Sequence, residues 1–381
     1  MRIAVDLLPV TSKPSGNRRF ALQLLTHIVE LSDAQNHFFF FCSRQNVSLF
    51  RERFTQANVT IMALPTLSVS PISRVLTEQL LLPLWLRKYK VDLLFAPQNV
   101  MPVLGNVPTV VAILSMHINY EQLNFPWWQR LYGRWILRWT SKKAEAFTAI
   151  SQFAADSYAE RYGISPKKIF VAPLGFDAHP DLKGDNTESL LDGEYILFVS
   201  ALHPHKNVRF LLRAFSHIAR KKSHVHLMIV GPDVNGESAR LNAMADQLGI
   251  AEQVHIMGAV SDEMLVRLYS HARLFVFPSL IEGFGLPALE AMAHSLPVVV
   301  SNRTSLPEVV GDAGIVLDPT DERAWSETII RLLEDDALSS EFAQRSKMRA
   351  GEFSWRRTAE ITLECFHSVL ASLSDAKEKK L

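Results

Sequence analysis

The sequence predicts an α/β protein built on doubly wound parallel sheets. Short apolar runs that are typical of buried strands recur along the chain, and segments with helical spacing of apolar residues separate them. Strands that alternate with helices favour parallel sheets covered by helices on both faces. Because the chain has 381 residues, we expect about two domains of this kind.

The apolar runs of the first half predict strands and helices in alternation. A helix over 74–90 is expected to be kinked or divided at Pro83. Further helices are expected at 20–31, at 127–143 and after Ser151. The expected strands are 3–7, 37–42, 59–63, 91–96, 110–115, 144–150 and 168–173.

A polar segment without periodicity, 178–193, is rich in Asp and Gly and is typical of a linker. We therefore expect a first domain at 1–177 and a second at 194–353. Most of 301–314 is expected to form a loop. The expected strands of the second half are 195–200, 225–230, 254–257, 274–277 and 296–300, and its helices are 208–221, 241–248, 264–272, 322–334 and 354–370.

The composition excludes several classes of protein. A hydrophobic content of 48% allows an ample core, and a net charge of +1 gives no overall field for nucleic acid. Cys42 and Cys365 lie far apart in apolar surroundings, which indicates free thiols and a reducing compartment. No apolar run reaches the length of about 18 residues that a membrane span needs, and the N-terminus reads as a strand rather than a signal peptide. We expect a cytoplasmic protein, or one bound at the inner face of the cell membrane.

One stretch, 278–292, has the residues of a ligand site. A buried strand comes before it, glycines follow, and Pro287 occupies an expected first helical position. The free N–H groups and the positive dipole end of such a helix attract anions. Gly283 and Gly285 let the backbone approach a ligand.

Two carboxylates flank this turn, Glu282 in the loop and Glu290 about one turn into the helix. A carboxylate accepts hydrogen bonds from neighbouring hydroxyls, so it suits sugar and ribose diols. Amides for phosphate and carboxylates for hydroxyls together predict a nucleotide-sugar site. On these residues alone, a plain strand–loop–helix with two surface glutamates stays open.

The glutamates and the words around them resemble a known family. Glu282 and Glu290 have the E-x7-E spacing of retaining GT-B glycosyltransferases of family four (group 1). The neighbouring words are similar residue for residue: Phe277-Pro278-Ser279, Glu282-Gly283-Phe284-Gly285-Leu286-Pro287 and Leu289-Glu290-Ala291-Met292-Ala293. The resemblance implies two Rossmann-like domains that face across a cleft. The first would bind the acceptor, the second the nucleotide-sugar, and the helix 354–370 would pack back on the first.

The resemblance also implies roles at the donor site. Glu282 faces the donor sugar and Glu290 holds the ribose in the family. Lys206 precedes a helix, where its ammonium suits a diphosphate; a solvated surface lysine is the alternative. The backbone of the turn 258–260 would touch the nucleobase. The implied donor-binding residues are Gly16, Lys206, Gly258, Val260, Glu282, Gly283, Phe284, Gly285, Leu286 and Glu290.

Two positions depart from the family's pattern for binding the diphosphate. Gly16 matches the N-terminal Gly-rich loop, but Arg18 stands where the family has a small residue, so a turn without a ligand stays open. Many members carry an arginine where this chain has Ala201. His203, His205 or an arginine of the first domain is expected to compensate.

A third departure concerns the histidine that faces the transferred sugar in the family. A His-Asp pair is common there, whereas here Ile118 follows His117 in place of the acid. His117 is the best match, and an ordinary loop histidine stays open. The implied catalytic residues are thus Glu282, Lys206 and His117.

The sequence lacks the motifs of several rival enzyme classes. Neither G-x-x-x-x-G-K-S/T nor G-x-G-x-x-G occurs, which disfavours P-loop NTPases and ordinary NAD enzymes. The metal-binding D-x-D motif is also absent. We expect a metal-independent reaction in which Lys206 and the helix start at 285–287 stabilise the leaving diphosphate.

The segment 127–143 combines an aromatic face with a basic flank. The aromatic and apolar residues at helical spacing are Trp127, Trp128, Leu131, Tyr132, Trp135, Ile136 and Trp139, and the basic ones are Arg130, Arg134, Arg138 and Lys142. Such a helix suits an anionic lipid surface. An ordinary amphipathic helix with its aromatics in the core is the alternative.

The segment 301–314 resembles the branch of the family that holds many mannosyltransferases of surface polysaccharide and lipopolysaccharide synthesis. The resemblance implies retaining transfer of a hexose from a GDP- or UDP-sugar, with GDP-mannose favoured over UDP-glucose, to a glycan or lipid-linked acceptor. Two alternatives stay open: an epimerase or hydrolase of nucleotide-sugars with the same fold, and a non-catalytic partner subunit.

Overall fold

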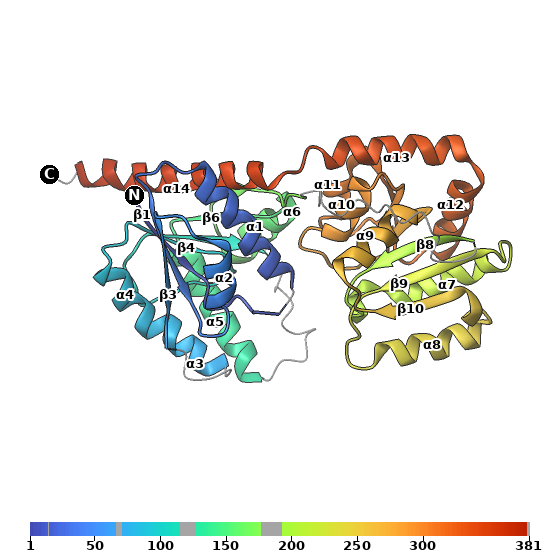
Figure 1. Cartoon of the computed structure of the whole chain (residues 1–381), viewed down its shortest axis with the longest axis horizontal. Coiled ribbons are helices and arrows are strands. Elements are labelled where there is room, and N and C mark those ends of the chain that lie inside the picture. The colour runs from blue at the N-terminus through green and yellow to red at the C-terminus, as the bar shows by residue number, and fades with distance from the viewer. Residues whose placement is uncertain (14, 66–70, 115–126, 177–192, 379–381) are drawn as a thin grey trace. The chain divides into compact units, whose positions relative to one another are not determined.

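The computed structural model describes residues 1–13, 15–65, 71–114, 127–176 and 193–378, and Figure 1 shows the whole chain. The chain divides into two compact units, 1–175 together with Trp355–Leu381, and Phe176–Ser354. Each unit is a parallel sheet covered by helices, so the predicted doubly wound α/β class is confirmed.

In the first unit, the described strands form one parallel sheet in the order β3-β2-β1-β4-β5-β6-β7. The strands are β1 Arg2–Asp6, β2 His37–Cys42, β3 Val59–Ala63, β4 Leu93–Ala96, β5 Thr109–Ile113, β6 Ala146–Ala149 and β7 Ile169–Val171. The helices are α1 Gly16–Leu31, α2 Val47–Arg53, α3 Pro71–Leu76, α4 Leu82–Lys88, α5 Trp127–Lys143, α6 Gln152–Tyr162 and α14 Trp355–Glu378. The last helix, α14, packs against α1.

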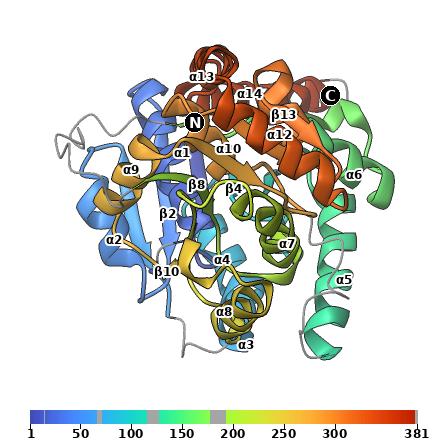
Figure 2. The same cartoon turned by 90° about the vertical axis from the view of Figure 1, so that its right-hand side faces the viewer.

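In the second unit, the described strands form a parallel sheet in the order β10-β9-β8-β11-β12-β13. The strands are β8 Glu194–Val199, β9 Val225–Val230, β10 Val254–Gly258, β11 Leu274–Phe277, β12 Val298–Ser301 and β13 Ile315–Leu317. The helices are α7 Val208–Ala219, α8 Glu237–Leu248, α9 Asp262–His271, α10 Leu286–Ala293, α11 Leu306–Val310, α12 Glu322–Glu334 and α13 Asp336–Ala350. Figure 2 shows α7 and α8 on one side of this sheet and α9 and α10 on the other.

The central strands are apolar along their whole length because helices cover both faces of each sheet. Residues 38–42 of β2 and all of β11 are buried. In both units the strand order reverses beside the first strand, between β1 and β4 and between β8 and β11. The crevice outside the carboxyl ends of the strands at such a reversal is where open α/β sheets bind ligands.

Among the described residues, the structure adds three α-helices and one strand to those predicted: α2, α11, α13 and β13. The helix α13 carries few apolar residues, so its sequence has little helical periodicity; Asp335 caps it by accepting a hydrogen bond from the Leu338 N–H at 2.9 Å. The helix α11 lies in a segment expected to form mostly loop.

The predicted helix 74–90 is divided, as expected, but by a π-helical turn at Thr77–Leu81 between α3 and α4. Pro83 lies in the first turn of α4. Proline has no N–H for the α-helical pattern, which accounts for the break just before it.

No helix in the described part of the chain is long and apolar enough to span a membrane.

Candidate functional site

A lysine and a glutamate that are far apart in the sequence meet at the strand reversal of the second unit. The ammonium Nζ of Lys206, after β8, lies 2.6 Å from Oε1 of Glu282, after β11. The two side chains are only 13% and 10% exposed. Lys206 also lies over the ring of Phe277, with Nζ 5.5 Å from the ring centroid.

Backbone hydrogen bonds join the two loops that carry this ion pair. The carbonyl of His205 accepts from the N–H of Leu280 at 2.8 Å. Asn207 has a left-handed backbone, with φ of 61°, and its side-chain amide donates to the carbonyls of Pro278 and Pro319 at 3.3 and 3.0 Å. A backbone hydrogen bond and the Asn207 side chain therefore hold the loops together, which fixes the backbone positions of Lys206 and Glu282.

The segment that begins at Thr304 supports the Glu282 loop from the other side. The N–H of Glu282 donates to the Thr304 hydroxyl at 3.0 Å. The Ser305 hydroxyl is within hydrogen-bond distance of the carbonyls of Glu282 and Phe284, at 3.2 and 2.9 Å. Because Ser305 is fully buried, these bonds hold the loop in one conformation.

Both the backbone conformation and the packing at position 285 require a glycine. Its φ of +110° is a region that side chains rarely adopt, and a Cβ there would lie 2.6 Å from the Cδ2 atom of Leu306. α10 begins at the next residue with Pro287 in its first turn. The positive dipole end of α10 lies at this turn, which makes its start a place for an anion.

Glu290 is buried in α10 rather than exposed on its surface, with 7% of the residue accessible. The hydroxyl of Tyr269 donates to its Oε2 at 3.0 Å. The ring of Tyr269 stacks on His294 with centroids 5.1 Å apart. The second glutamate of the E-x7-E pair is therefore held by an aromatic side chain that the sequence did not indicate.

His203 and His205 lie on the same loop as Lys206, and their rings stack with centroids 5.3 Å apart. Burial, the positive charge of Lys206 and the neighbouring His203 lower the pKa of His205 to about 4. Burial and Lys206 also lower the pKa of His203. Both shifts favour the neutral form of the imidazole.

Two glycines shape the neighbouring strand ends. Gly258, with φ of 69°, ends β10, and its carbonyl accepts from the N–H of Gly231 at 2.8 Å. A Cβ on Gly231 would lie 1.9 Å from the carbonyl oxygen of Ser200, so only glycine fits there. Val260 is half-buried just beyond Gly258. The sequence did not show that position 231 requires glycine, because the requirement comes from the close approach of Ser200, just after β8.

The first unit holds Gly16, which is the first residue of α1 instead of part of a loop. Ser15 caps this helix by accepting from the N–H of Arg18 at 3.3 Å, and the guanidinium of Arg18 donates to the Ser12 carbonyl at 2.6 Å. A Cβ on Gly16 would meet no atom within 4 Å. His117 lies outside the described residues.

A buried acidic pair at the strand reversal of the first unit was also missed. Asp6 ends β1 and Glu78 lies in the π-helical turn, and each is 2% exposed. Burial raises the pKa of Glu78 to about 7, against the opposing effects of Arg74 and Gln79. Burial and Glu78 raise the pKa of Asp6 as well. An aspartate at the end of an apolar strand was the signal available in the sequence.

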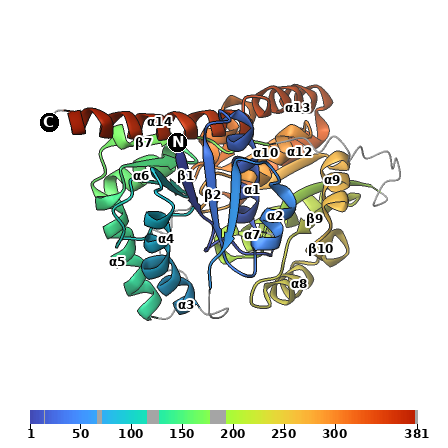
Figure 3. The ribbon, with the colours of Figure 1, turned by 60° about the vertical axis from the view of Figure 1, so that its left-hand side comes forward.

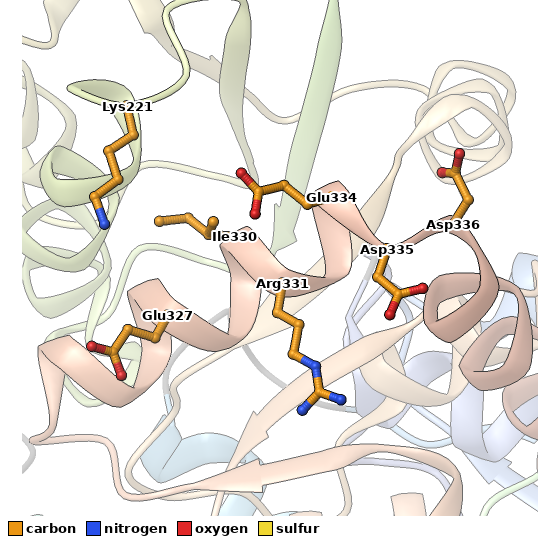
Figure 4. Close-up of a pocket in the computed structure, with 7 residues that line it drawn as sticks. All are labelled: Lys221, Glu327, Ile330, Arg331, Glu334, Asp335 and Asp336. Carbon is orange, nitrogen blue, oxygen red and sulfur yellow. The ribbon is translucent and has the colours of Figure 1, made fainter.

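A shallow pocket of the second unit lies along α12 and the start of α13, next to Lys221 (Figure 4). Four of its lining residues are acidic: Glu327, Glu334, Asp335 and Asp336. Glu334 pairs with Lys222 at 2.8 Å. A diphosphate would be repelled there, so this pocket is not a candidate site for a nucleotide.

Among the described residues, no cluster of three or more His, Cys, Asp or Glu side chains could hold a metal ion.

Two family models match the chain, one on each half. The model of "Glycosyltransferase Family 4" matches residues 18–179, and that of "Glycosyl transferases group 1" matches residues 185–349. The chain belongs to glycosyltransferase family 4. In this family 4 glycosyltransferase, the candidate site around Lys206 and Glu282 lies in the half matched by the group 1 model.

Several curated relatives of this family 4 protein are named as mannosyltransferases. O-antigen chain mannosyltransferase B of Escherichia coli is 39% identical over 45% of each chain. The serotype-specific mannosyltransferase WbdA of Escherichia coli is 32% identical over 61% of this chain and 30% of its own length. The O-antigen chain mannosyltransferase RfbU of Salmonella typhimurium is 27% identical over 88% of this chain and 92% of its own. The matches to the first two thus span less than half of those proteins.

Solved structures confirm the GT-B fold of this family 4 glycosyltransferase. A sucrose-phosphate synthase from Thermosynechococcus elongatus matches 98% of this chain and all of its own, with a TM-score of 0.78 and 19% identity. WaaG, a glycosyltransferase involved in lipopolysaccharide biosynthesis, matches 94% of this chain and 97% of its own, with a TM-score of 0.70 and 18% identity. HepE of Anabaena, solved with UDP-glucose, matches 97% of this chain and 100% of its own, with a TM-score of 0.75 and 17% identity.

Proposed function

We propose that this protein is a retaining hexosyltransferase that moves mannose from a nucleoside diphosphate sugar to a glycan or lipid-linked acceptor of surface polysaccharide. The observation that carries the proposal is the Lys206–Glu282 ion pair at the strand reversal of the second unit. Two nearly enclosed opposite charges, next to the free start of α10, match the charges and hydroxyls of a sugar diphosphate.

In this proposal the donor replaces the ion pair by two better-matched contacts. The ammonium of Lys206 turns to the diphosphate, and the carboxylate of Glu282 accepts hydrogen bonds from the sugar hydroxyls. As the bond between sugar and phosphate breaks, negative charge grows on the diphosphate. Lys206 and the N–H groups of Gly285 and Leu286 stabilise that charge without a metal ion.

The remaining donor contacts follow from the same loop. Glu290, oriented by Tyr269, accepts from the ribose hydroxyls, and the backbone of Gly283, Phe284 and Leu286 borders the phosphates. The turn of Gly258 and Val260 borders the nucleobase. The first unit binds the acceptor.

The choice of mannose is supported by two of the relatives, which are named as O-antigen chain mannosyltransferases. The buried free thiols of Cys42 and Cys365 support a reducing, cytoplasmic site of reaction. Retention would follow if the acceptor hydroxyl attacks from the face that the diphosphate leaves.

Calorimetry with GDP-mannose and UDP-glucose tests the donor, and NMR of the product tests the stereochemistry. We expect GDP-mannose to bind more tightly and the α-anomeric configuration to be kept in the product. Incubation without an acceptor is the control, and sugar release at an equal rate there would identify a hydrolase or epimerase instead. Absence of binding to either donor would contradict the proposal as a whole.

A further inference from the structure

Exposed apolar side chains gather on one surface of the first unit. Among the described residues, ten of the thirteen large hydrophobic side chains that are exposed belong to α3, α4, α5 and the segments next to them. They are Ile72, Leu76, Leu80, Leu84, Leu104, Trp127, Trp128, Leu131, Trp135 and Trp139. Figure 3 shows α3, α4 and α5 along the same side of the unit.

The helix α5 presents its tryptophans outward and packs on the sheet with other residues. Ile136 and Leu137 are 1% and 3% exposed, whereas Trp135 and Trp139 are 48% and 42% exposed. The alternative in which the aromatics form core is therefore wrong for four of the tryptophans. Apolar side chains of this size rarely gather on a surface without a partner.

A second exposed stripe runs along α3, the π-helical turn and α4. Ile72, Leu76, Leu80 and Leu84 follow each other at intervals of four, and each is more than half exposed. In a regular α-helix, positions four apart drift by about 40° around the axis. The π-helical turn at 77–81 has more residues per turn and offsets part of this drift, so the stripe stays outward.

The segment 101–105 joins the two stripes into one surface. The N–H of Val103 donates to the side chain of Gln79 at 2.8 Å, and its carbonyl accepts from Lys143 Nζ at 2.6 Å. Gly105 lies beside Pro83. Leu104, 59% exposed, therefore lies between α5 and the stripe that contains Leu80 and Leu84.

The charges on this surface are positive. α5 contains five basic residues and no acidic one, and Arg134, Arg138, Lys142 and Lys143 are exposed. Arg87 and Lys88 are exposed at the end of α4. The only acid between 71 and 90 is Glu78, which is buried.

We infer that the two stripes and Leu104 form one membrane-docking face that binds anionic lipid headgroups with its cations and inserts its tryptophans and leucines at the interface. Tryptophan beside arginine is the combination that suits the boundary between headgroups and acyl chains. A second copy of this chain fits poorly because its basic α5 would meet another basic α5. The inference goes beyond the proposed function, since docking does not require the reaction.

Flotation of the full-length protein with vesicles tests the face. We expect binding to phosphatidylcholine vesicles that contain phosphatidylglycerol, weaker binding to phosphatidylcholine alone, and a loss of binding as salt is raised. Six of the seven tryptophans, all but Trp325, belong to the first unit, so binding should also shift the emission to the blue.

Two double variants test the two stripes separately. Leu76→Ser/Leu80→Ser removes part of the stripe along α3 and the π-helical turn, and Arg134→Glu/Arg138→Glu reverses charge on α5. Each should weaken vesicle binding at least about tenfold. Met348→Ser, at a residue 76% exposed in the second unit, is the matched control and should bind as wild type does.

Three outcomes would overturn the inference. The first is no binding to anionic vesicles. The second is binding unaffected by Leu76→Ser/Leu80→Ser, which would leave α5 acting alone. The third is a dimer in sedimentation equilibrium that the same substitutions dissolve, with no lipid binding. Donor binding by calorimetry should be equal in all variants, so failure here is distinct from failure of the proposed function.

Discussion

At the scale of single residues, the proposed donor chemistry depends on a few enclosed polar contacts. Lys206 and Glu282 neutralise each other in an environment that is about nine-tenths closed to water. Removing one partner leaves the other charge uncompensated, which is costly in a buried site. Tyr269 acts through another residue, because its hydroxyl orients the Glu290 carboxylate.

Neutral substitutions at the ion pair should slow transfer strongly. We expect Lys206→Met and Glu282→Gln each to lower kcat by about 10²-fold, the scale for loss of one group that stabilises developing charge. The double variant should lose less than the product of the two. Steady-state kinetics measures this, with circular dichroism as the check on folding. The control is Glu237→Gln, which breaks another ion pair of the same unit, with Arg209; a control as slow as Lys206→Met would contradict the assignment.

Loss of the Tyr269 hydroxyl should weaken nucleotide binding through the ribose. Tyr269→Phe is expected to raise the dissociation constant for the nucleoside diphosphate by about 2- to 10-fold, the range for one hydrogen bond. The effect should vanish with a dideoxy nucleotide that lacks the ribose hydroxyls. Tyr195→Phe is the matched control, because its hydroxyl donates to the Leu268 carbonyl. Equal weakening of both nucleotides would mean a merely structural role for Tyr269.

At the scale of elements, the π-helical turn between α3 and α4 serves two surfaces. Its outward residue Leu80 belongs to the membrane-docking face, and its inward residue Glu78 lies at the end of β1 near Asp6. Gln79 ties the turn to the segment 101–105. The turn points the apolar side chain of Leu80 outward and the acidic side chain of Glu78 inward. This requirement accounts for its local departure from the α-helix.

The raised pKa of Glu78 predicts how the stability of the first unit depends on pH. The folded protein holds a proton up to about pH 7, whereas the unfolded chain loses it near its ordinary value of 4.5. Stability should therefore fall as pH rises from about 4.5 to 7, and the raised pKa of Asp6 acts in the same direction.

Urea unfolding followed by tryptophan emission measures this, because most of the tryptophans lie in the first unit. Glu78→Gln should flatten the dependence, since glutamine cannot ionise and can still accept from Gln79. Parallel pH profiles for the variant and the wild type would contradict the prediction.

At the scale of the whole molecule, the chain crosses from the second unit back to the first between α13 and α14. Trp355 is fully buried, with its ring 6.2 Å from that of Phe20, and Phe366 lies 5.2 Å from Phe95 on β4. The last helix is therefore part of the core of the first unit, although the whole second unit comes before it in sequence.

Substitution in α14 should destabilise the first unit and spare the nucleotide site. Phe366→Ala is expected to cost about 3–5 kcal/mol, the range for truncating a buried aromatic side chain. Calorimetry should show unchanged nucleoside diphosphate binding by the folded protein. Met348→Ala, at an exposed position, is the control. Loss of nucleotide binding in folded Phe366→Ala would contradict the assignment of the nucleotide to the second unit.

The sequence by itself determined the fold class and most of the elements. Strands such as 37–42 and 274–277 are continuous apolar runs because they are buried on both faces, so composition alone marks them. The turn at 278–292 could also be predicted, because its glycines, proline and glutamates lie close together in the sequence. Elements with weak periodicity, such as α13, were not readable from the pattern.

Only the tertiary structure decided which distant groups meet. Lys206 and Glu282 are 76 positions apart, and Tyr269 and Glu290 are 21 apart, so no local pattern specifies either contact. The period of 127–143 showed an amphipathic helix, but which face covers the sheet depends on the packing of Ile136 and Leu137. Local patterns fix local conformation, whereas contacts between loops and exposure of a helix face follow from how the sheets bring segments together.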